Sequence, residues 1–136
     1  MADYRIDTLG LLEPEPRGDL HEVAGELRLA SRAGVAVVAE PAGPGDTALT
    51  LTDRAMSALD VDAMVIDWEP CELAGEPAVR TLVLEQLGGL ATVVLEQWRL
   101  VAADTAWTVT ATADLAAWAS LAEALRRAVA TLEVEP

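Results

Sequence analysis

The clearest pattern of hydrophobic and polar positions lies in the second half of the chain. Two stretches rich in Val, Leu and Thr, residues 78–87 and 90–101, are separated only by Gly88-Gly89. Two adjacent glycines suit a type I′ turn, whose twist matches that of the flanking strands. The pattern therefore predicts a long β-hairpin with a two-residue loop, in which Val83 lies opposite Val94.

Both faces of this predicted hairpin are apolar. Alternate residues of a strand point to opposite sides of a sheet, so the pairing assigns each residue to a face. One face carries Val79, Val83, Val94 and Trp98, and the other carries Leu82, Leu84, Val93 and Leu95. Because neither face suits contact with water, we expect other elements to cover the sheet on both sides.

Further strands flank the hairpin. A turn at Ala103-Asp104 predicts a second hairpin, with Leu100 opposite Trp107, that continues to residue 113. Residues 35–39 and 64–68 are also typical of strands, the second closed by a proline at position 70. The segment from position 73 to 77 predicts a turn, in which Gly75 is free to take a positive φ.

Two segments show helical periodicity. In residues 114–132, apolar side chains recur at intervals of three and four residues. Residues 46–59 carry a shorter stripe. The two apolar stripes consist of Leu115, Trp118, Leu121, Leu125, Val129 and Leu132, and of Leu49, Ala55, Met56 and Leu59.

The first third of the chain is harder to interpret. Residues 1–18 contain prolines among acidic residues and predict an irregular lead-in. In residues 19–34, Asp19 followed by Glu22 resembles a capping box and favours a helix slightly, whereas the alternation in residues 26–29 is that of a strand. Both alternatives remain open.

Together these elements predict one α+β domain spanning residues 1–136. Its core is an antiparallel meander sheet covered by helices on both faces, an α/β/α sandwich. The order of elements resembles the PsbP-like domains, through the turn at 72–80, the long hairpin, the strand at 107–113 and the closing helix. The resemblance covers residues 35–134 and implies a non-catalytic, protein-binding or chaperone-like role. The first third lacks the Pro-Trp-containing strand region with which that group usually opens.

Composition narrows the possible partners. The chain has 23 acidic and 9 basic residues, a formal net charge of −14. Such a charge is repelled by nucleic acid and by anionic membranes, and no uncharged apolar run reaches the roughly 18 residues of a membrane helix. Lys, Asn and Phe are absent, which suggests a GC-rich bacterial genome. The N-terminus lacks the pattern of a signal peptide and Cys71 is the single cysteine, so we expect a cytoplasmic protein.

No catalytic, metal-binding or cofactor-binding set stands out. His21 has no second ligand at metal spacing, and acidic neighbours make Cys71 a poor nucleophile. Glu85 and Glu96 are predicted to share one hairpin face, where burial together would make a catalytic pair conceivable. Arg80, together with Arg99, is predicted to lie on the opposite face. Solvated or Arg-paired carboxylates are the simpler interpretation.

The four tryptophans are the remaining candidates. Trp98, Trp107 and Trp118 are expected in the core, whereas Trp68, at a strand end, is expected to be partly exposed and available to a partner. For any one of the four, core filling is the simpler interpretation. The favoured function is a non-catalytic protein-binding or chaperone-like accessory domain, with a protein partner or a homodimer and no cofactor. The alternative is a small-molecule-binding domain or enzyme with a pocket between helix and sheet, using Glu85, Glu96 or Arg80.

Overall fold

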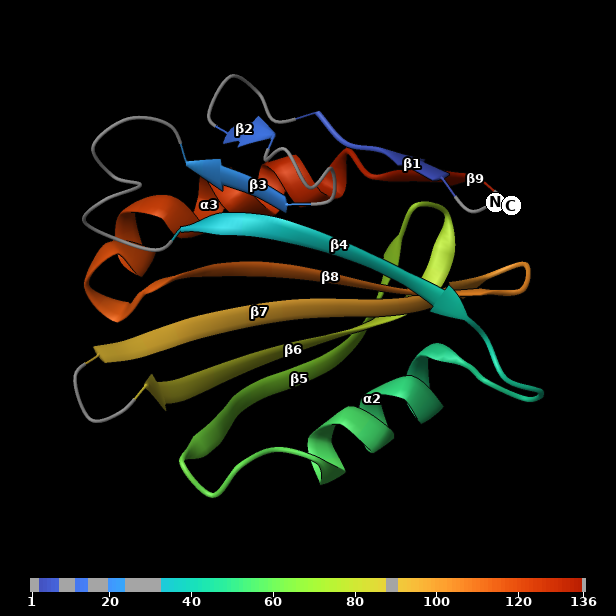
Figure 1. The fold of residues 1–136 in the computed structure, drawn as a ribbon, viewed down its shortest axis with the longest axis horizontal. Coiled ribbons are helices and arrows are strands. Elements are labelled where there is room, and N and C mark those ends of the chain that lie inside the picture. Colours follow the sequence, from blue (N-terminus) through green and yellow to red (C-terminus); the bar gives the residue numbers. More distant parts are fainter. Residues whose placement is uncertain (1–2, 8–11, 15–19, 24–32, 88–90, 136) are drawn as a thin grey trace.

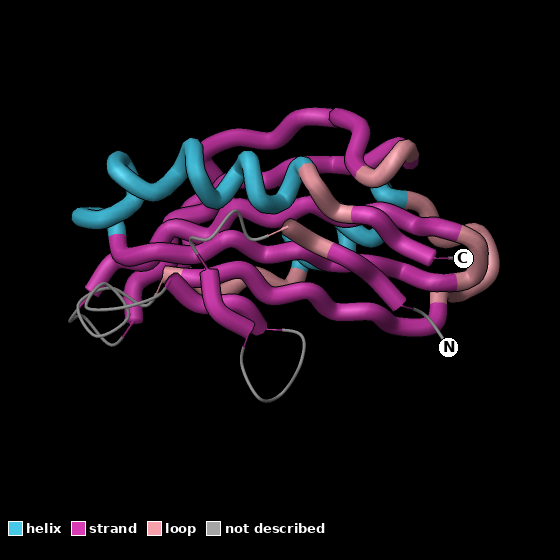
Figure 2. Tube along the Cα trace, turned by 90° about the horizontal axis from the view of Figure 1, so that it is seen from above, coloured by secondary structure: helices cyan, strands magenta, loops and turns pink. Residues whose placement is uncertain are grey.

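A computed structural model describes residues 3–7, 12–14, 20–23, 33–87 and 91–135. Seven strands form one antiparallel sheet in the order β2-β3-β4-β8-β7-β6-β5 (Figure 1). Near the two ends of the chain, β1 pairs with β9 (Figures 1 and 2). The strands are β1 (Asp3–Arg5), β2 (Leu12–Pro14), β3 (Leu20–Val23), β4 (Gly34–Pro41), β5 (Ala63–Leu73), β6 (Glu76–Leu87), β7 (Ala91–Ala102), β8 (Thr105–Asp114) and β9 (Glu133–Glu135).

Two helices accompany the sheet in the described part of the chain. Helix α3 (Leu115–Ala130) packs on β4, β7 and β8, and helix α2 (Ala48–Ser57) packs on β6 and β7. The predicted α+β class and antiparallel sheet are therefore confirmed. Cover by helices over the whole of both faces is not established, since Val38 on β4 remains 44% exposed.

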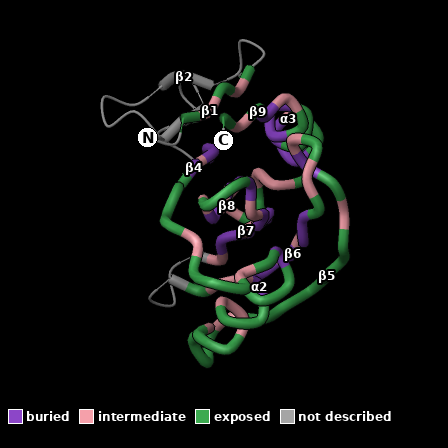
Figure 3. The backbone as a smooth tube through the Cα atoms, turned by 90° about the vertical axis from the view of Figure 1, so that its right-hand side faces the viewer, coloured by how far each residue is buried: buried purple, intermediate pink, exposed green. Residues whose placement is uncertain are grey.

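The core lies between α3 and the sheet. Leu125 and Val129 of α3 are almost fully buried together with Val35, Leu100 and Trp107 of the strands. Buried segments in Figure 3 follow β7, β8 and the inner side of α3, whereas β5 is exposed along most of its length. The helical stripe predicted from the sequence is thus the face that builds the core, except at Leu115, which is 49% exposed.

Helix α2 buries the expected face in part: Ala55 and Met56 are partly buried, but the two buried positions are not those predicted. Its buried residues are Ala48 and Thr52, whereas Leu49 is 48% exposed. The Thr52 hydroxyl donates to the carbonyl of Ala48 at 2.8 Å, so it needs no water once it is buried. The helix begins after Thr47, whose side chain forms a capping box with Thr50.

The long hairpin is confirmed, but its predicted register is wrong by one residue. Leu84, not Val83, lies opposite Val94, and Leu87 pairs with Ala91. The predicted turn at residues 88–89 lies outside the described residues. A shift of one residue moves the side chains of one strand to the other face relative to its partner. This shift decides the composition of the candidate site.

The neighbouring turns agree with the sequence. Leu100 lies opposite Trp107 as predicted, across a turn in which Ala103 has a φ of 53°. The turn between β5 and β6 places Ala74 and Gly75 at φ values of 55° and 76°. Positive φ at both central positions is typical of the type I′ hairpin turn.

The N-terminal predictions need correction. Strands at 3–5 and 12–14 occupy part of the predicted irregular lead-in. In the ambiguous segment, residues 20–23 form a strand rather than a helix, and residues 24–32 lie outside the described part. His21 of this strand pairs with Val35 of β4. Pairing with a neighbouring strand therefore outweighs the local capping pattern, as tertiary contacts commonly do.

Candidate functional site

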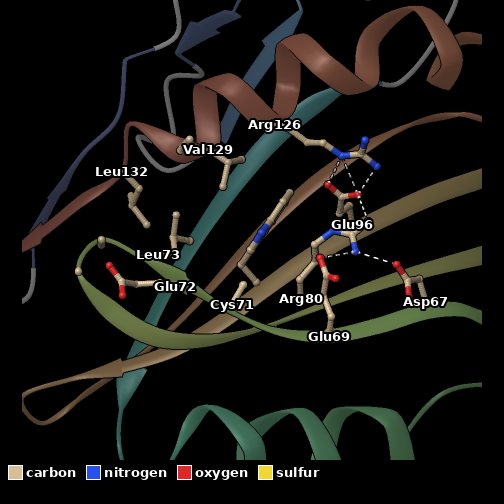
Figure 4. A pocket seen from close by; sticks show the side chains of 14 residues that line it. Asp67, Glu69, Cys71, Glu72, Leu73, Arg80, Glu96, Arg126, Val129 and Leu132 are labelled. Atoms are coloured by element: carbon tan, nitrogen blue, oxygen red, sulfur yellow. Dashed lines mark hydrogen bonds and ion pairs between the residues drawn. The ribbon is translucent and has the colours of Figure 1, made fainter.

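A pocket of about 770 Å³ lies between α3 and strands β5, β6 and β7 (Figure 4). Its volume is within the range of small-molecule sites. One part of its wall is apolar, with Trp98, Val129 and Leu132, and another part is charged. The charged side chains are Asp67, Glu69 and Glu72 of β5, Arg80 of β6, Glu96 of β7 and Arg126 of α3.

Glu96 is the centre of the charged part. Its side chain is fully buried. The Arg126 Nε donates to Glu96 Oε1 at 2.7 Å, the Arg126 Nη2 donates to Oε2 at 2.7 Å, and the Arg80 Nη2 donates to Oε2 at 3.0 Å. Two guanidinium groups from different elements thus neutralise one buried carboxylate, which is the arrangement that burial of a charge requires.

Arg80 links this carboxylate to the edge of the sheet. Its Nη1 donates to Asp67 at 3.0 Å and to Glu69 at 3.2 Å. Burial acts to lower the pKa of Arg80, but hydrogen bonds to Asp67 and Glu96 outweigh it and hold the pKa above its usual value. The hydrogen bond to Glu96 likewise raises the pKa of Arg126. Both guanidinium groups therefore remain charged.

The pocket as a whole is acidic. Its lining contains four carboxylates and two guanidinium groups, an excess of two negative charges. The side chains of Asp67 and Glu69 are about half exposed at the mouth of the pocket. Among the described residues, Glu72 has no hydrogen-bond or ion-pair partner, although Figure 4 shows it at the pocket.

The pocket holds no recognisable nucleophile or metal site. Burial raises the pKa of the Cys71 thiol, and the neighbouring Glu69 raises it further, so the reactive thiolate is disfavoured. Within the described ranges, no three His, Cys, Asp or Glu side chains gather around a point that could hold a metal ion. The side chain of His21 lies outside the part that the structure describes.

The structure separates the carboxylates that the sequence placed together. Glu85 lies opposite Val93, whereas Glu96 faces α3 beside Arg80, so the predicted shared face is wrong. The predicted separation of Arg80 from Glu96 is wrong for the same reason, the one-residue change of register. The sequence interpretation missed Arg126. Its spacing from Ala122 and Val129, both buried, was the available signal, because such residues share a helix face.

The other notable surface is the outer edge of the sheet. Strand β5 exposes Met64, Val65, Ile66 and Trp68 by 61%, 44%, 49% and 42%. A bulge between Val65 and Asp67 shifts the register there. These four residues, called the β5 apolar surface below, include the predicted contact residue Trp68. Trp68 lies within β5 and not at a strand end as predicted, because the strand continues through Pro70 to Leu73. As expected from the sequence, Trp98 and Trp107 are buried and Trp118 packs against the core.

The free edge beside this surface is partly protected. The Trp68 N–H donates to the Asp67 carboxylate at 2.9 Å. Two residues further along, Pro70 has no N–H to donate. Charged side chains and proline are features by which natural edge strands resist the addition of another strand. The side chains of β5 are therefore better available to a partner than its backbone donors between residues 67 and 70.

Solved structures resemble the whole of this arrangement. A Pseudomonas aeruginosa protein of unknown function, PA94, covers 100% of this chain and 84% of its own length, at 16% identity and a TM-score of 0.61. The Synechocystis PsbP protein CyanoP covers 98% of this chain and 92% of its own length, at 14% identity and a TM-score of 0.57. The chain has the PsbP-like fold.

A third structure shares the PsbP-like fold. LpqN of Mycobacterium tuberculosis, which is involved in cell envelope biogenesis, covers 100% of this chain and 84% of its own length, at 17% identity and a TM-score of 0.55. No protein-family model and no curated protein sequence matches the chain. In the part of the chain that is described, no helix has the length and apolar character needed to cross a membrane.

Proposed function

We propose that this protein is a non-catalytic accessory domain that binds another protein through the β5 apolar surface. The observation that carries the proposal is the exposure of Met64, Val65, Ile66 and Trp68 on one edge strand. Large exposed apolar side chains gathered on one edge strand mark an interaction site more often than scattered apolar residues do. Trp68 is the expected anchor, because large aromatic side chains dominate binding energies at interfaces.

The position of this surface supports the proposal. We infer that α2 and α3 cover the sheet from opposite faces, as in an α/β/α sandwich, and that β5 extends beyond that cover. PA94 is described as a proposed regulator and LpqN as a participant in envelope biogenesis. Neither description names a reaction, which is consistent with an accessory role.

A heterologous partner is favoured over a second copy. Two copies of a chain with a net charge of −14 repel each other, and Asp67 and Glu69 lie on the same strand as the apolar surface. The same charge argues against nucleic acid and anionic membranes. We also propose a cytoplasmic location, for which the single cysteine is the support; cell fractionation would test it.

A client-protection assay tests the proposed function. We would measure light scattering while reduced lysozyme, a basic client, or reduced α-lactalbumin, an acidic client of the same fold, aggregates with the intact protein present. We expect protection of at least one client, and its loss in the double variant Val65→Ser, Trp68→Ser. The control Leu49→Ser, Leu115→Ser removes two equally exposed apolar side chains elsewhere and should protect like the wild type.

Two results would count against the proposal. Aggregation of both clients at the rate seen without the protein would remove the chaperone-like binding activity. Equal protection by the β5 variant and the control would show that the β5 apolar surface is not the contact. Equal urea midpoints for all three proteins would show that the substitutions, all at exposed positions, leave folding intact.

The pocket supports a second candidate function, the binding of a small molecule between α3 and the sheet. Its volume of about 770 Å³ and its combination of an apolar wall with convergent charges are features of ligand sites. A thermal-shift screen would test this candidate, since a ligand that binds only the folded state raises the unfolding temperature. No stabilisation across a broad metabolite library would argue against it.

A further inference from the structure

We propose that the partner segment bound along β5 is basic as well as apolar, and that one of its Lys or Arg side chains enters the acidic pocket. This inference rests on the proposed function and specifies its partner. It joins two features that the fold places side by side, the β5 apolar surface and the pocket whose charged mouth β5 also forms.

The first argument is the alternation of side chains along β5. Asp67, Glu69 and Cys71 line the pocket, and the intervening Trp68 and Pro70 belong to the other face of the strand. An extended segment lying along this edge therefore meets carboxylates on one side and an exposed indole on the other. A segment with alternating basic and apolar side chains complements both.

The second argument is the charge that the pocket leaves uncompensated. Arg80 and Arg126 bind Glu96, and Arg80 also binds Asp67 and Glu69. Glu72 has no such partner among the described residues, and the lining keeps an excess of two negative charges. A carboxylate or phosphate ligand would add to this excess, whereas an ammonium or guanidinium group would reduce it.

The third argument is the apolar wall beyond the carboxylates. Leu73, Val129 and Leu132 line the pocket together with Glu72. Lys and Arg side chains carry an apolar stem below the charged group, and they commonly lay the stem along apolar surface. A basic side chain thus matches the wall and the acidic mouth at the same time, which a small inorganic cation does not.

The test measures peptide binding by fluorescence anisotropy with the intact protein. The probe is an extended nine-residue peptide in which Lys alternates with Val and Leu. A second peptide has Glu in place of each Lys, and a third has Ser in place of each apolar residue. We expect the first peptide to bind in a salt-sensitive manner, because exposed charge pairs are screened by added salt, and the other two to bind more weakly.

Matched variants locate the contact. Glu69→Gln with Glu72→Gln should weaken binding of the Lys peptide about five- to tenfold, as expected for two partly exposed charge pairs. Glu123→Gln with Asp104→Asn changes the net charge equally at exposed positions outside the pocket and should leave the affinity close to that of the wild type. Equal weakening by both double variants would reduce the effect to overall charge and would overturn the inference.

The outcomes also separate this inference from the proposed function. Equal affinity for the Lys and Glu peptides would overturn the basic partner, yet protection of clients that depends on Val65 and Trp68 would leave the proposed function standing. If none of the peptides and neither client binds, both the proposed function and this inference are overturned. A preference for lysozyme over α-lactalbumin that the Glu69, Glu72 variant loses would support both.

Discussion

Strand β7 carries two buried charged residues, three positions apart and on opposite faces. They differ in whether the groups that bind them carry an opposite charge. Glu96 on the α3 face is bonded to Arg126 and to Arg80, both with opposite charge. Arg99 on the other face is 6% exposed and bonds to the neutral side chains of Thr81 and Gln97 at 3.3 and 2.7 Å. Burial lowers the pKa of Arg99, with no carboxylate to oppose it.

The difference shows what each face of the sheet does. On the α3 face, a charge is buried only because three elements bring opposite charges to one point, which ties α3 to the edge strand. On the opposite face of the sheet, Thr81 and Arg99 are buried beside Val79, Val83 and Val93, so the charge of Arg99 lies among apolar and neutral side chains and not in an ion cluster. We therefore expect substitutions of the buried charges on the two faces to lower the free energy of unfolding by different amounts.

The largest effect is expected for Glu96→Gln. Removal of one partner from a buried ion cluster leaves the others uncompensated, which commonly costs about 3–5 kcal/mol. Arg80 keeps Asp67 and Glu69, and Arg126 is partly exposed, so the loss should be near about 3 kcal/mol on that scale. Urea unfolding followed by tryptophan fluorescence measures it.

The control for this prediction is Glu85→Gln, which removes a partly exposed carboxylate outside the cluster. We expect it to change the free energy of unfolding by less than about 0.5 kcal/mol. Equal losses for the two variants would show that the ion cluster does not stabilise the fold beyond an ordinary carboxylate, and the contrast between the faces would disappear.

A smaller effect is expected for Arg99→Met. The substitution removes a buried charge that lacks a counter-charge, which is favourable, and it also removes two hydrogen bonds to neutral groups, which is unfavourable. Gln97 keeps its bond to Thr110 at 3.0 Å. We expect a net loss below about 1 kcal/mol in the same urea experiment. A loss as large as that of Glu96→Gln would contradict the difference between the faces.

The smallest effect concerns pH and Asp67. The hydrogen bond from Arg80 holds the pKa of Asp67 below the ordinary value of 3.8, with the Trp68 N–H adding to it. Because the folded pKa is the lower one, this contribution is fully present above pH 3.8 and is lost as pH falls through the folded pKa.

The variant Asp67→Asn should therefore be slightly less stable than the wild type at pH 7, and the difference should shrink as the solution is acidified below pH 4. Urea midpoints of both proteins across the acid range measure this. Asp46→Asn, next to α2, is the variant for comparison in the same measurement. The pKa of Asp46 is also lowered, first by the hydrogen bond from the Gly43 N–H and then by the one from Arg54. A gap between Asp67→Asn and wild type that stays constant with pH would contradict the assigned cause.

Local sequence was sufficient for much of the fold. The stripe in residues 114–132 predicted α3 and the face it buries, because an amphipathic helix shows its own packing surface. The Ala103-Asp104 turn predicted the register of β7 and β8. In each case, neighbouring residues contain the needed information.

The candidate site was decided by tertiary structure. The two glycines at 88–89 predicted a two-residue loop, and the resulting register, wrong by one residue, placed Glu85 and Glu96 on one face although they lie on opposite faces. The pairing of Glu96 with Arg126 depends on how α3 lies on β7, which no local pattern specifies. Sequence alone therefore determined the two helices, the strands between residues 34 and 114 and the acidity of this protein, whereas pairing between strands decided the N-terminal elements, and sheet register and helix packing decided which charges meet.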